Sequence, residues 1–147
     1  MVKGKEALLN SLSDLFDEKY EELTGLLTPE MTAMEQLLFL NRELFHMIED
    51  SISLDLLARL YSTQLTTNGE KHLLDHNRIY YKLLRKIIAK GQSEGQLSSR
   101  SNVNEMVKLY ALCERALLYD WCLCAGEYAL TEYSAKVLPG FLSSFLP

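Results

Sequence analysis

The stretch from Asn102 to Gly126, NVNEMVKLYALCERALLYDWCLCAG, decides the fold class, because its apolar residues recur at helical spacing on two faces. Asn102, with Glu105 three residues later, resembles a capping box and predicts the helix start, and Gly126 predicts its end. One apolar stripe consists of Met106, Tyr110, Cys113, Leu117, Trp121 and Cys124, and the other of Val107, Ala111, Leu118, Cys122 and Ala125. We expect this helix to be the longest and the most apolar, with one of its faces covered by a partner subunit.

Five further apolar periods predict the remaining helices of an all-α, six-helix bundle. They run over residues 8–23, from Thr28-Pro29 to about Asp50, from Ser53 to Leu65, from a start within 69–75 to Lys90-Gly91, and over 130–145 with an interruption and kink at Pro139. Leucine occurs 30 times, against nine valines and isoleucines together, and strands prefer β-branched residues. The composition therefore disfavours a large sheet.

Length and charge exclude several classes of protein. The chain has 147 residues, which suits one domain over 1–147, and its net charge of −5 disfavours direct nucleic-acid binding. Residues 71–100 are basic, which we interpret as a solvated helix face, with a phosphate or membrane-surface patch as the alternative. No apolar run is long enough to span a membrane, and no secretory signal is present. The three clustered cysteines suit a reducing cytoplasm.

Two motifs resemble those of TetR-type transcriptional regulators. Residues 2–9, VKGKEALL, resemble the junction that opens the helix linking the DNA-binding head to the body. Residues 87–97, IIAKGQSEGQL, resemble the family's loop of two isoleucines, Gly-Gln, an acidic residue, Gly, a polar residue and Leu. The helix over 102–126, with Trp121 near its end, and the terminal helix match the order of the family's last two helices. The resemblance covers almost the whole chain.

The resemblance implies a regulatory body that dimerises and holds a small hydrophobic or aromatic effector. The family's N-terminal helix-turn-helix head is missing from this sequence, so the chain is either a truncated regulator or a headless relative. We expect DNA contact only through such a head, and therefore none by this chain itself. The last two helices of each chain are expected to form a four-helix bundle in a homodimer. The residues expected in that interface are Leu118, Cys122, Ala125, Leu138, Phe141 and Leu142.

Aromatic and sulfur side chains on the central helices are the candidates for lining an effector cavity between helices. They are Phe45, Tyr61, Tyr80, Tyr110, Cys113 and Trp121, with Met34 beside them and with His46, Arg42 and Asp120 as polar groups that could converge on the cavity. Plain core packing is the alternative for each of them. Tight packing of Phe45, Tyr61, Tyr110 and Trp121 without a void would favour a headless helical interaction module that binds no ligand.

Other chemistry has weak support in the sequence. His72 and His76 are one helical turn apart, but a pair at this spacing is a weak metal signal, so we predict no metal and no cofactor. Cys122 and Cys124 would point about 200° apart on a helix, so we interpret them as buried apolar residues. No nucleophile, base and acid stand in a catalytic pattern, so an enzyme is not expected. A small helical enzyme or metal protein remains the third hypothesis.

Overall fold

The chain forms six α-helices in the computed structural model, which describes the backbone of residues 2–66, 74–75 and 78–147 and, within these ranges, the side chains from residue 11 onward. No strand occurs among these described residues. The elements are α1 Val2–Leu26, α2 Ala33–Ser51, α3 Leu54–Thr66, α4 Ile79–Ser93, α5 Val103–Leu123, α6 Leu130–Phe141 and the 3₁₀ turn η2 Ser143–Phe145. The expectation of an all-α chain with six helices is therefore confirmed over this part of the chain. The longest helix is α1, with 25 residues, and not α5, which has 21.

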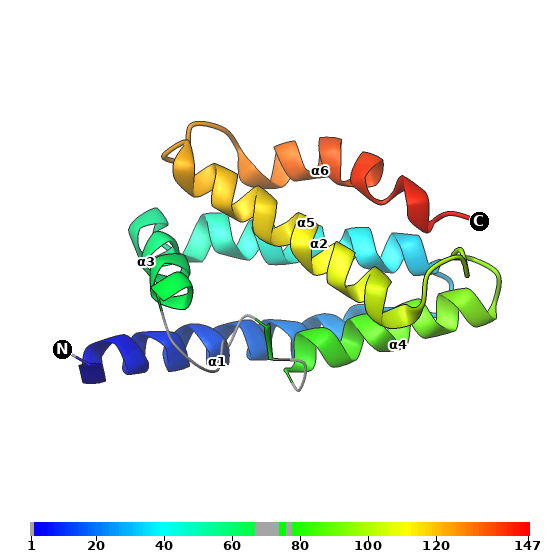
Figure 1. Ribbon diagram of the computed structural model, residues 1–147, viewed down its shortest axis with the longest axis horizontal. Coiled ribbons are helices and arrows are strands. Elements are labelled where there is room, and N and C mark those ends of the chain that lie inside the picture. The colour runs from blue at the N-terminus through cyan, green and yellow to red at the C-terminus, as the bar shows by residue number, and fades with distance from the viewer. Residues whose placement is uncertain (1, 67–73, 76–77) are drawn as a thin grey trace.

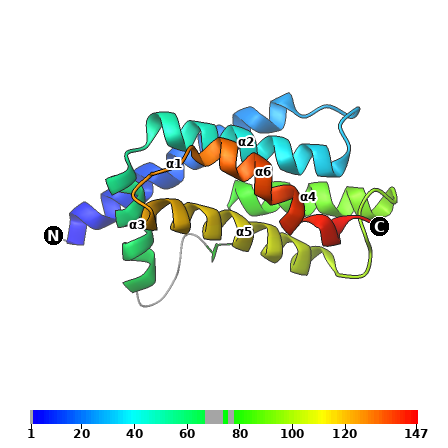
Figure 2. The same ribbon diagram turned by 90° about the horizontal axis from the view of Figure 1, so that it is seen from above.

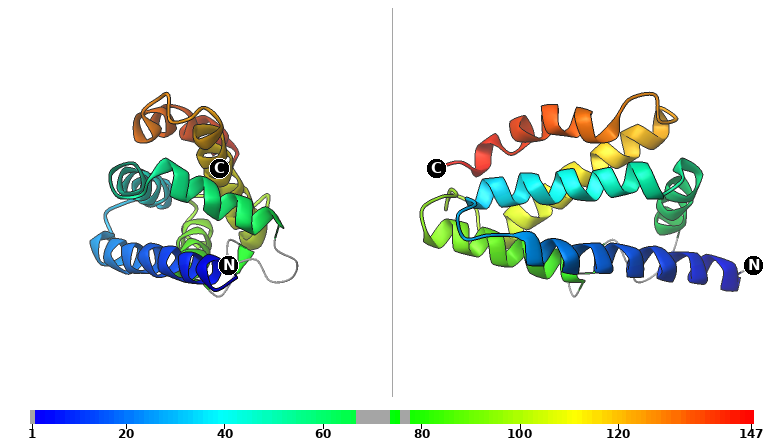
Figure 3. Two further views of the ribbon diagram at one scale, coloured as in Figure 1. Left: turned by 90° about the vertical axis from the view of Figure 1, so that its left-hand side faces the viewer. Right: turned by 180° about the vertical axis from the view of Figure 1, so that it is seen from behind.

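The helices are stacked in three tiers (Figure 1). α1 and α4 lie side by side at the base, and α2 and α5 cross above them. α6 lies over α2 and α5, as the view from above shows (Figure 2). The end-on view shows α3 running across one end of the stack (Figure 3). In this arrangement α1, α2, α3 and the first part of α4 surround the middle of α5, where the candidate site lies.

Helix starts follow local capping chemistry. Ser53 and Asn102 cap α3 and α5 as predicted, because their side chains accept hydrogen bonds from the backbone N–H three residues later, at 3.1 Å and 2.8 Å. The prediction that Thr28 caps the second helix is wrong. Thr32 caps α2 instead, because its hydroxyl accepts from Glu35 N while the Glu35 carboxylate accepts from Thr32 N, a complete capping box.

Two other helix boundaries differ from the expectation. α4 begins at Ile79 rather than within 69–75, and most of that expected start, residues 69–73, lies outside the described residues. Pro139 lies inside α6 and does not interrupt it, since the helix continues to Phe141. A proline near the last turn removes only one backbone hydrogen bond, which the helix end tolerates.

The 87–97 loop fixes the end of α4 against the start of α2. Gly91 packs so closely on α2 that an added Cβ would lie 2.6 Å from the Ala33 Cβ. Gly95 turns the chain with φ +75°, a conformation that favours glycine. The Gln96 side chain then accepts a hydrogen bond of 2.8 Å from Ala33 N, and Leu97 is buried. Residues 87–97 thus hold the end of α4 against the start of α2.

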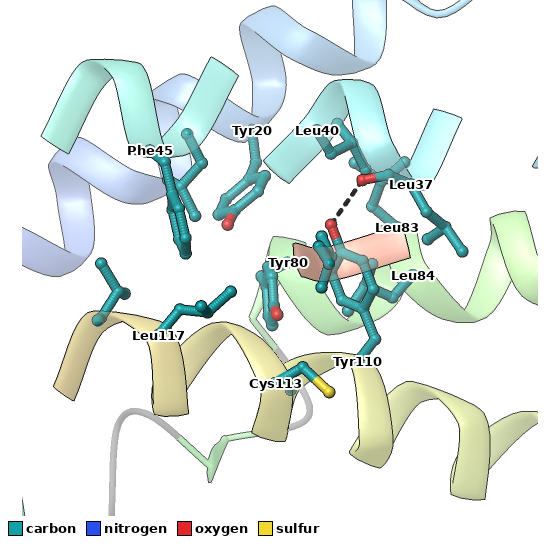
Figure 4. Packing of buried hydrophobic residues seen from close by; sticks show 14 of the residues in the cluster. Tyr20, Leu37, Leu40, Phe45, Tyr80, Leu83, Leu84, Tyr110, Cys113 and Leu117 are labelled. Atoms are coloured by element: carbon teal, nitrogen blue, oxygen red, sulfur yellow. Dashed lines mark hydrogen bonds between the residues drawn. The ribbon is translucent and has the colours of Figure 1, made fainter. Parts of the chain in front are cut away.

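The core is shared by all the helices, and aromatic residues fill its centre. Phe45 and Tyr110 are fully buried, and the Tyr110 hydroxyl donates a hydrogen bond of 2.7 Å to the Leu37 carbonyl (Figure 4). Tyr20 and Tyr80 lie in the same region with their ring centroids 5.0 Å apart. None of the described helices combines the length and apolarity that crossing a bilayer requires.

Candidate functional site

A half-enclosed cavity of about 50 Å³ lies among α1, α2, α3, α4 and α5. Tyrosines from three of these helices line it: Tyr20 of α1, Tyr61 of α3, and Tyr80 and Tyr81 of α4. Charged lining groups are Glu114 and Arg115 of α5 and Arg78, which precedes α4. The remaining wall is apolar and consists of Phe16, Leu44, Ile48, Leu57, Leu60, Ala111 and Leu118. An apolar enclosure with a few converging polar groups is the usual form of a small-molecule site.

A buried carboxylate, that of Glu114, lines this cavity, with 4% of the residue's surface exposed. The Tyr80 hydroxyl donates to its Oε1 over 2.5 Å, and Asn41 Nδ2 donates to its Oε2 over 2.9 Å. Asn41 Oδ1 in turn accepts from the Ser134 hydroxyl over 2.6 Å. Three hydrogen bonds therefore join α4, α5, α2 and α6 through the core.

Burial controls the ionisation of these groups. Desolvation raises the pKa of Glu114, although hydrogen bonds from Tyr80 and Asn41 and the charge of Arg115 oppose the shift. Burial, together with the nearby Glu114 carboxylate, also raises the pKa of Tyr20 and of Tyr80 far above the ordinary range. These tyrosines are therefore neutral hydroxyls that donate and accept hydrogen bonds at any physiological pH.

The Tyr80 hydroxyl has a hydrogen-bond partner in Glu114, and the hydroxyls of Tyr20 and Tyr61 differ from it in this respect. Within the described residues, neither hydroxyl has a hydrogen-bond partner in the protein, although Tyr20 is 3% exposed and Tyr61 is partly buried. Buried tyrosine hydroxyls normally find a partner. Both side chains line the cavity, so it contains hydrogen-bonding capacity that the described protein groups leave unused.

The structure brings together only two of the predicted cavity residues, Tyr61 and Tyr80. Phe45 and Tyr110 pack fully in the core, and Cys113 is buried at 9% exposure. Trp121 is also buried, and its indole N–H donates to the Tyr128 carbonyl over 2.9 Å. None of these four side chains lines the cavity.

The polar groups expected to converge on the cavity lie elsewhere. His46 is exposed on α2 and pairs with Asp50 at 3.1 Å. The Arg42 guanidinium lies 5.5 Å from the centre of the Phe39 ring. Asp120 accepts a hydrogen bond of 2.8 Å from the Tyr128 hydroxyl. A helical period fixes the side of the helix but not which neighbour fills the space there.

Sequence reasoning missed the polar members of the site, above all Glu114 and Asn41. Glu114 follows Tyr110 by one helical turn and precedes Leu117 by three residues, so it falls inside the inner stripe of α5. A charged residue within an apolar stripe is the signal that could have found it. Tyr20 likewise carries a polar group on the inner face of α1, where its neighbours are the buried residues Leu12, Phe16 and Leu23.

The residues expected at a dimer interface fall into two groups. Leu118, Leu138 and Leu142 are buried within the single chain, so they are not available to a partner. Phe141 and Ala125 are exposed, and Cys122 is partly exposed. Leu118 lines the cavity among α1–α5, and Leu138 and Leu142 lie in the core at the end of α6, which packs on α2 and α5.

A different apolar stripe of α5 faces outward. Leu112, Tyr119 and Leu123 are 51%, 53% and 70% exposed, and their spacing of seven and four residues places them on one helix face. On α6, Tyr133 and Phe141 are 42% and 51% exposed and eight residues apart. Single exposed apolar residues are ordinary, but two helices that each carry such a stripe are typical of an interaction surface.

The histidine and cysteine hypotheses have different outcomes. His72 and His76 lie outside the described residues. Among the residues that are described, no group of three or more His, Cys, Asp or Glu side chains is placed to hold a metal ion. Cys122 and Cys124 are free and only partly buried, which corrects the expectation that both are buried.

No protein-family model matches this sequence, and comparisons with curated proteins and with solved structures find no match either.

Proposed function

We propose that this chain is the effector-binding and dimerisation domain of a TetR-type transcriptional regulator. The observation that supports this proposal best is the composition of the cavity wall. Phe16 and Tyr20 of α1 form one side, while α2, α3, α4 and α5 form the other sides. α1 carries the sequence that resembles the link to a DNA-binding head, so the cavity lies directly against the helix that would transmit a signal.

The proposed mechanism uses the packing of α1. The centroids of the Tyr20 and Tyr80 rings are 5.0 Å apart. A ligand that enters between α1 and α4 therefore has to displace this ring contact or pack against it. A ligand changes the spacing of two heads only as far as it binds one spacing better than the other. Coupling of this kind is typically about 1–3 kcal/mol, and it lowers DNA affinity by the same factor by which DNA lowers ligand affinity.

Dimerisation is proposed through α5 and α6 of each subunit. The exposed stripes on these helices, Leu112, Tyr119 and Leu123 on α5 with Tyr133 and Phe141 on α6, provide apolar surface for a four-helix bundle. A symmetric two-fold contact is the commonest closed assembly of identical chains. It would hold the two α1 helices at a defined distance, which is what a two-headed regulator needs.

The decisive experiment measures the distance between the two α1 helices. Spin labels would be placed at Ser11→Cys, on an exposed position of α1, in a variant whose native cysteines are replaced. A panel of small aromatic and aliphatic molecules is first screened for compounds that raise the melting temperature, since ligands selective for the folded state stabilise it. The distance between labels is then measured with and without the best compound.

The control label is Glu94→Cys, on the exposed turn after α4. A dimer whose Ser11→Cys distance shifts with ligand, while the Glu94→Cys distance does not, supports the proposal. The proposal is contradicted by a monomer, or by a dimer in which the Ser11→Cys label distance is the same with and without every stabilising compound.

The second candidate function is a helical interaction module without a ligand. Two observations favour it: Phe45 and Tyr110 pack without exposure, and the cavity of about 50 Å³ is far below the roughly 300–1,000 Å³ of drug-sized sites. This candidate predicts that the apolar stripes of α5 and α6 bind another helical chain and that no small molecule stabilises the fold. The same screen therefore separates the two functions.

A further inference from the structure

We propose that the cavity among α1, α2, α3, α4 and α5 binds a small organic carboxylate, held by the Tyr20 and Tyr61 hydroxyls and by Arg115. This inference rests on the proposed function, because it names the chemical class of the effector at that site. The hydrogen-bonding groups and charges that line this cavity support the assignment.

The hydroxyls of Tyr20 and Tyr61 can each donate and accept a hydrogen bond, whereas the Arg115 guanidinium can only donate. Both oxygens of Glu114 already accept, one from Tyr80 and one from Asn41. The hydroxyls of Tyr20 and Tyr61 line the same cavity without a hydrogen-bond partner among the described residues. A ligand that offers acceptor oxygens can accept from both hydroxyls and from Arg115, while a ligand that offers only donors cannot pair with the Arg115 guanidinium.

The charge at the cavity points the same way. Among the described residues, the charged groups that line it are the guanidinium groups of Arg78 and Arg115 and the carboxylate of Glu114. Arg115 Nη1 donates to the Tyr81 hydroxyl over 3.2 Å, which orients the guanidinium beside the cavity. Guanidinium groups form strong, often bidentate, hydrogen bonds with carboxylates. An anionic group therefore gains both charge pairing and hydrogen bonds here.

The size of the cavity limits what is enclosed. A volume of about 50 Å³ holds a carboxylate and a short apolar portion of the ligand, not a drug-sized molecule. The apolar wall supplied by Leu57, Leu60 and Leu118 suits that portion. Because the cavity is only half enclosed, a larger acid can place its carboxylate inside and its remainder toward the opening.

The test is a titration followed by NMR of leucine and isoleucine methyl groups, with matched probes. Acetate is compared with acetamide, its neutral isostere, and benzoate with benzamide and benzylammonium. We expect each carboxylate to bind about ten-fold or more tightly than its amide, the scale of one charge-assisted hydrogen bond. The methyl groups of Leu57, Leu60 and Leu118 should shift.

Two variants assign the contacts. Arg115→Gln should weaken benzoate about ten-fold and leave benzamide unchanged. Arg59→Gln, an exposed arginine of α3 paired with Asp55, should change neither affinity and serves as the control. Tyr61→Phe should weaken both benzoate and benzamide, whereas Tyr133→Phe, on the exposed face of α6, should weaken neither.

Each other outcome overturns the carboxylate assignment. Equal binding of benzoate and benzamide, or preferential binding of benzylammonium at the same methyl groups, refutes the ligand class but leaves an effector cavity in place. Shifts confined to methyl groups away from the cavity, or no binding by any probe, refute the carboxylate site itself. The proposed function is judged separately, by oligomeric state and by the α1 distance.

Discussion

The Tyr80 hydroxyl of α4 and the Glu114 carboxylate of α5 form a hydrogen bond of 2.5 Å in the core. It is the first link of a polar row that continues through Asn41 of α2 to Ser134 of α6. Every member of the row is less than a tenth exposed. A satisfied buried network fixes one arrangement of the helices, because any shift of register leaves a buried polar group unpaired.

Removing Glu114 should therefore be costly. Glu114→Ala leaves the Tyr80 hydroxyl and the Asn41 amide without their shared acceptor and opens a void, so we expect unfolding to become easier by about 3–5 kcal/mol. Glu18→Ala, on an exposed position of α1, should change stability by less than about 0.5 kcal/mol. Urea unfolding followed by circular dichroism measures both. Similar midpoints for the two variants would show that the buried network does not stabilise the fold.

Glu114 should also give the protein an unusual pH dependence. Burial raises its pKa above the ordinary value of 4.5, so the folded state holds this proton to a higher pH than the unfolded state does. The free energy of unfolding then falls as pH rises from about 4.5 through the folded-state pKa, and the full contribution is present only below that range. Glu114→Gln cannot titrate, so it should gain stability relative to the wild type as the pH rises from about 4.5 through the folded-state pKa of Glu114.

Unfolding measured for both proteins across that range provides the test. The amide introduced by Glu114→Gln also has to face the Asn41 amide, so a constant offset between the two curves is expected as well. Curves that stay parallel throughout would contradict the titration of Glu114.

Gly91 should tolerate no side chain. An alanine there would place its Cβ 2.6 Å from the Ala33 Cβ and 2.7 Å from Leu97 Cδ1, so we expect α2 and α4 to separate at a cost of about 1–3 kcal/mol. Gly25→Ala is the matched control, because that glycine is also helical and no atom lies within 4 Å of its added Cβ. It should stabilise the protein by about 0.5–1 kcal/mol. Thermal unfolding of both variants distinguishes close packing from helix propensity.

Glu49 of α2 should act as the cap of α6. Its carboxylate accepts from Leu130 N and Thr131 N at 2.8 Å and 2.7 Å, while Ala129 provides no side-chain cap. Partial burial opposes ionisation, but these hydrogen bonds lower the pKa of Glu49. Its contribution is therefore present above the unfolded-state pKa and is lost as pH falls through the folded-state value.

We expect Glu49→Ala to cost about 1–2 kcal/mol near neutral pH, as loss of a helix cap does. Asp50→Ala removes the neighbouring exposed carboxylate and its pairing with His46, and should cost less than about 1 kcal/mol. Chemical unfolding near pH 7 compares the two. An equal effect would mean that Glu49 acts through its charge alone and not through the start of α6.

Local signals in the sequence predicted the helices better than the site. Ser53 and Asn102 were assigned correctly because a cap depends on residues three positions apart. The start of α2 was placed wrongly because Thr28-Pro29 and Thr32 both satisfy a capping rule. Thr32 differs in having Glu35 three residues later, whose carboxylate accepts from Thr32 N while its own N–H donates to the Thr32 hydroxyl.

The cavity could not be predicted in the same way, because a void depends on neighbours that are distant in sequence. The inward faces of Phe45 and Tyr110 were predicted, but other helices fill the space around them. Glu114 was overlooked because a charge is usually counted as surface, although its position in the apolar stripe of α5 indicated burial. The interface residue Leu118 was misassigned because a stripe gives a direction and not the identity of the covering element.

The surface proposed for dimerisation can be tested without harming the fold. Leu123→Glu adds a charge to the outward stripe of α5, where the leucine is 70% exposed, so the single chain should keep its stability. In a dimer the same charge would be buried at the interface, and dissociation should become easier by at least about 2 kcal/mol. Leu65→Glu, on α3 with the leucine 73% exposed, is the matched control and should leave the dimer intact. Sedimentation velocity at several concentrations measures both. Loss of the dimer only in Leu65→Glu would move the interface to α3, and a wild-type chain that stays monomeric at high concentration would refute the α5–α6 interface.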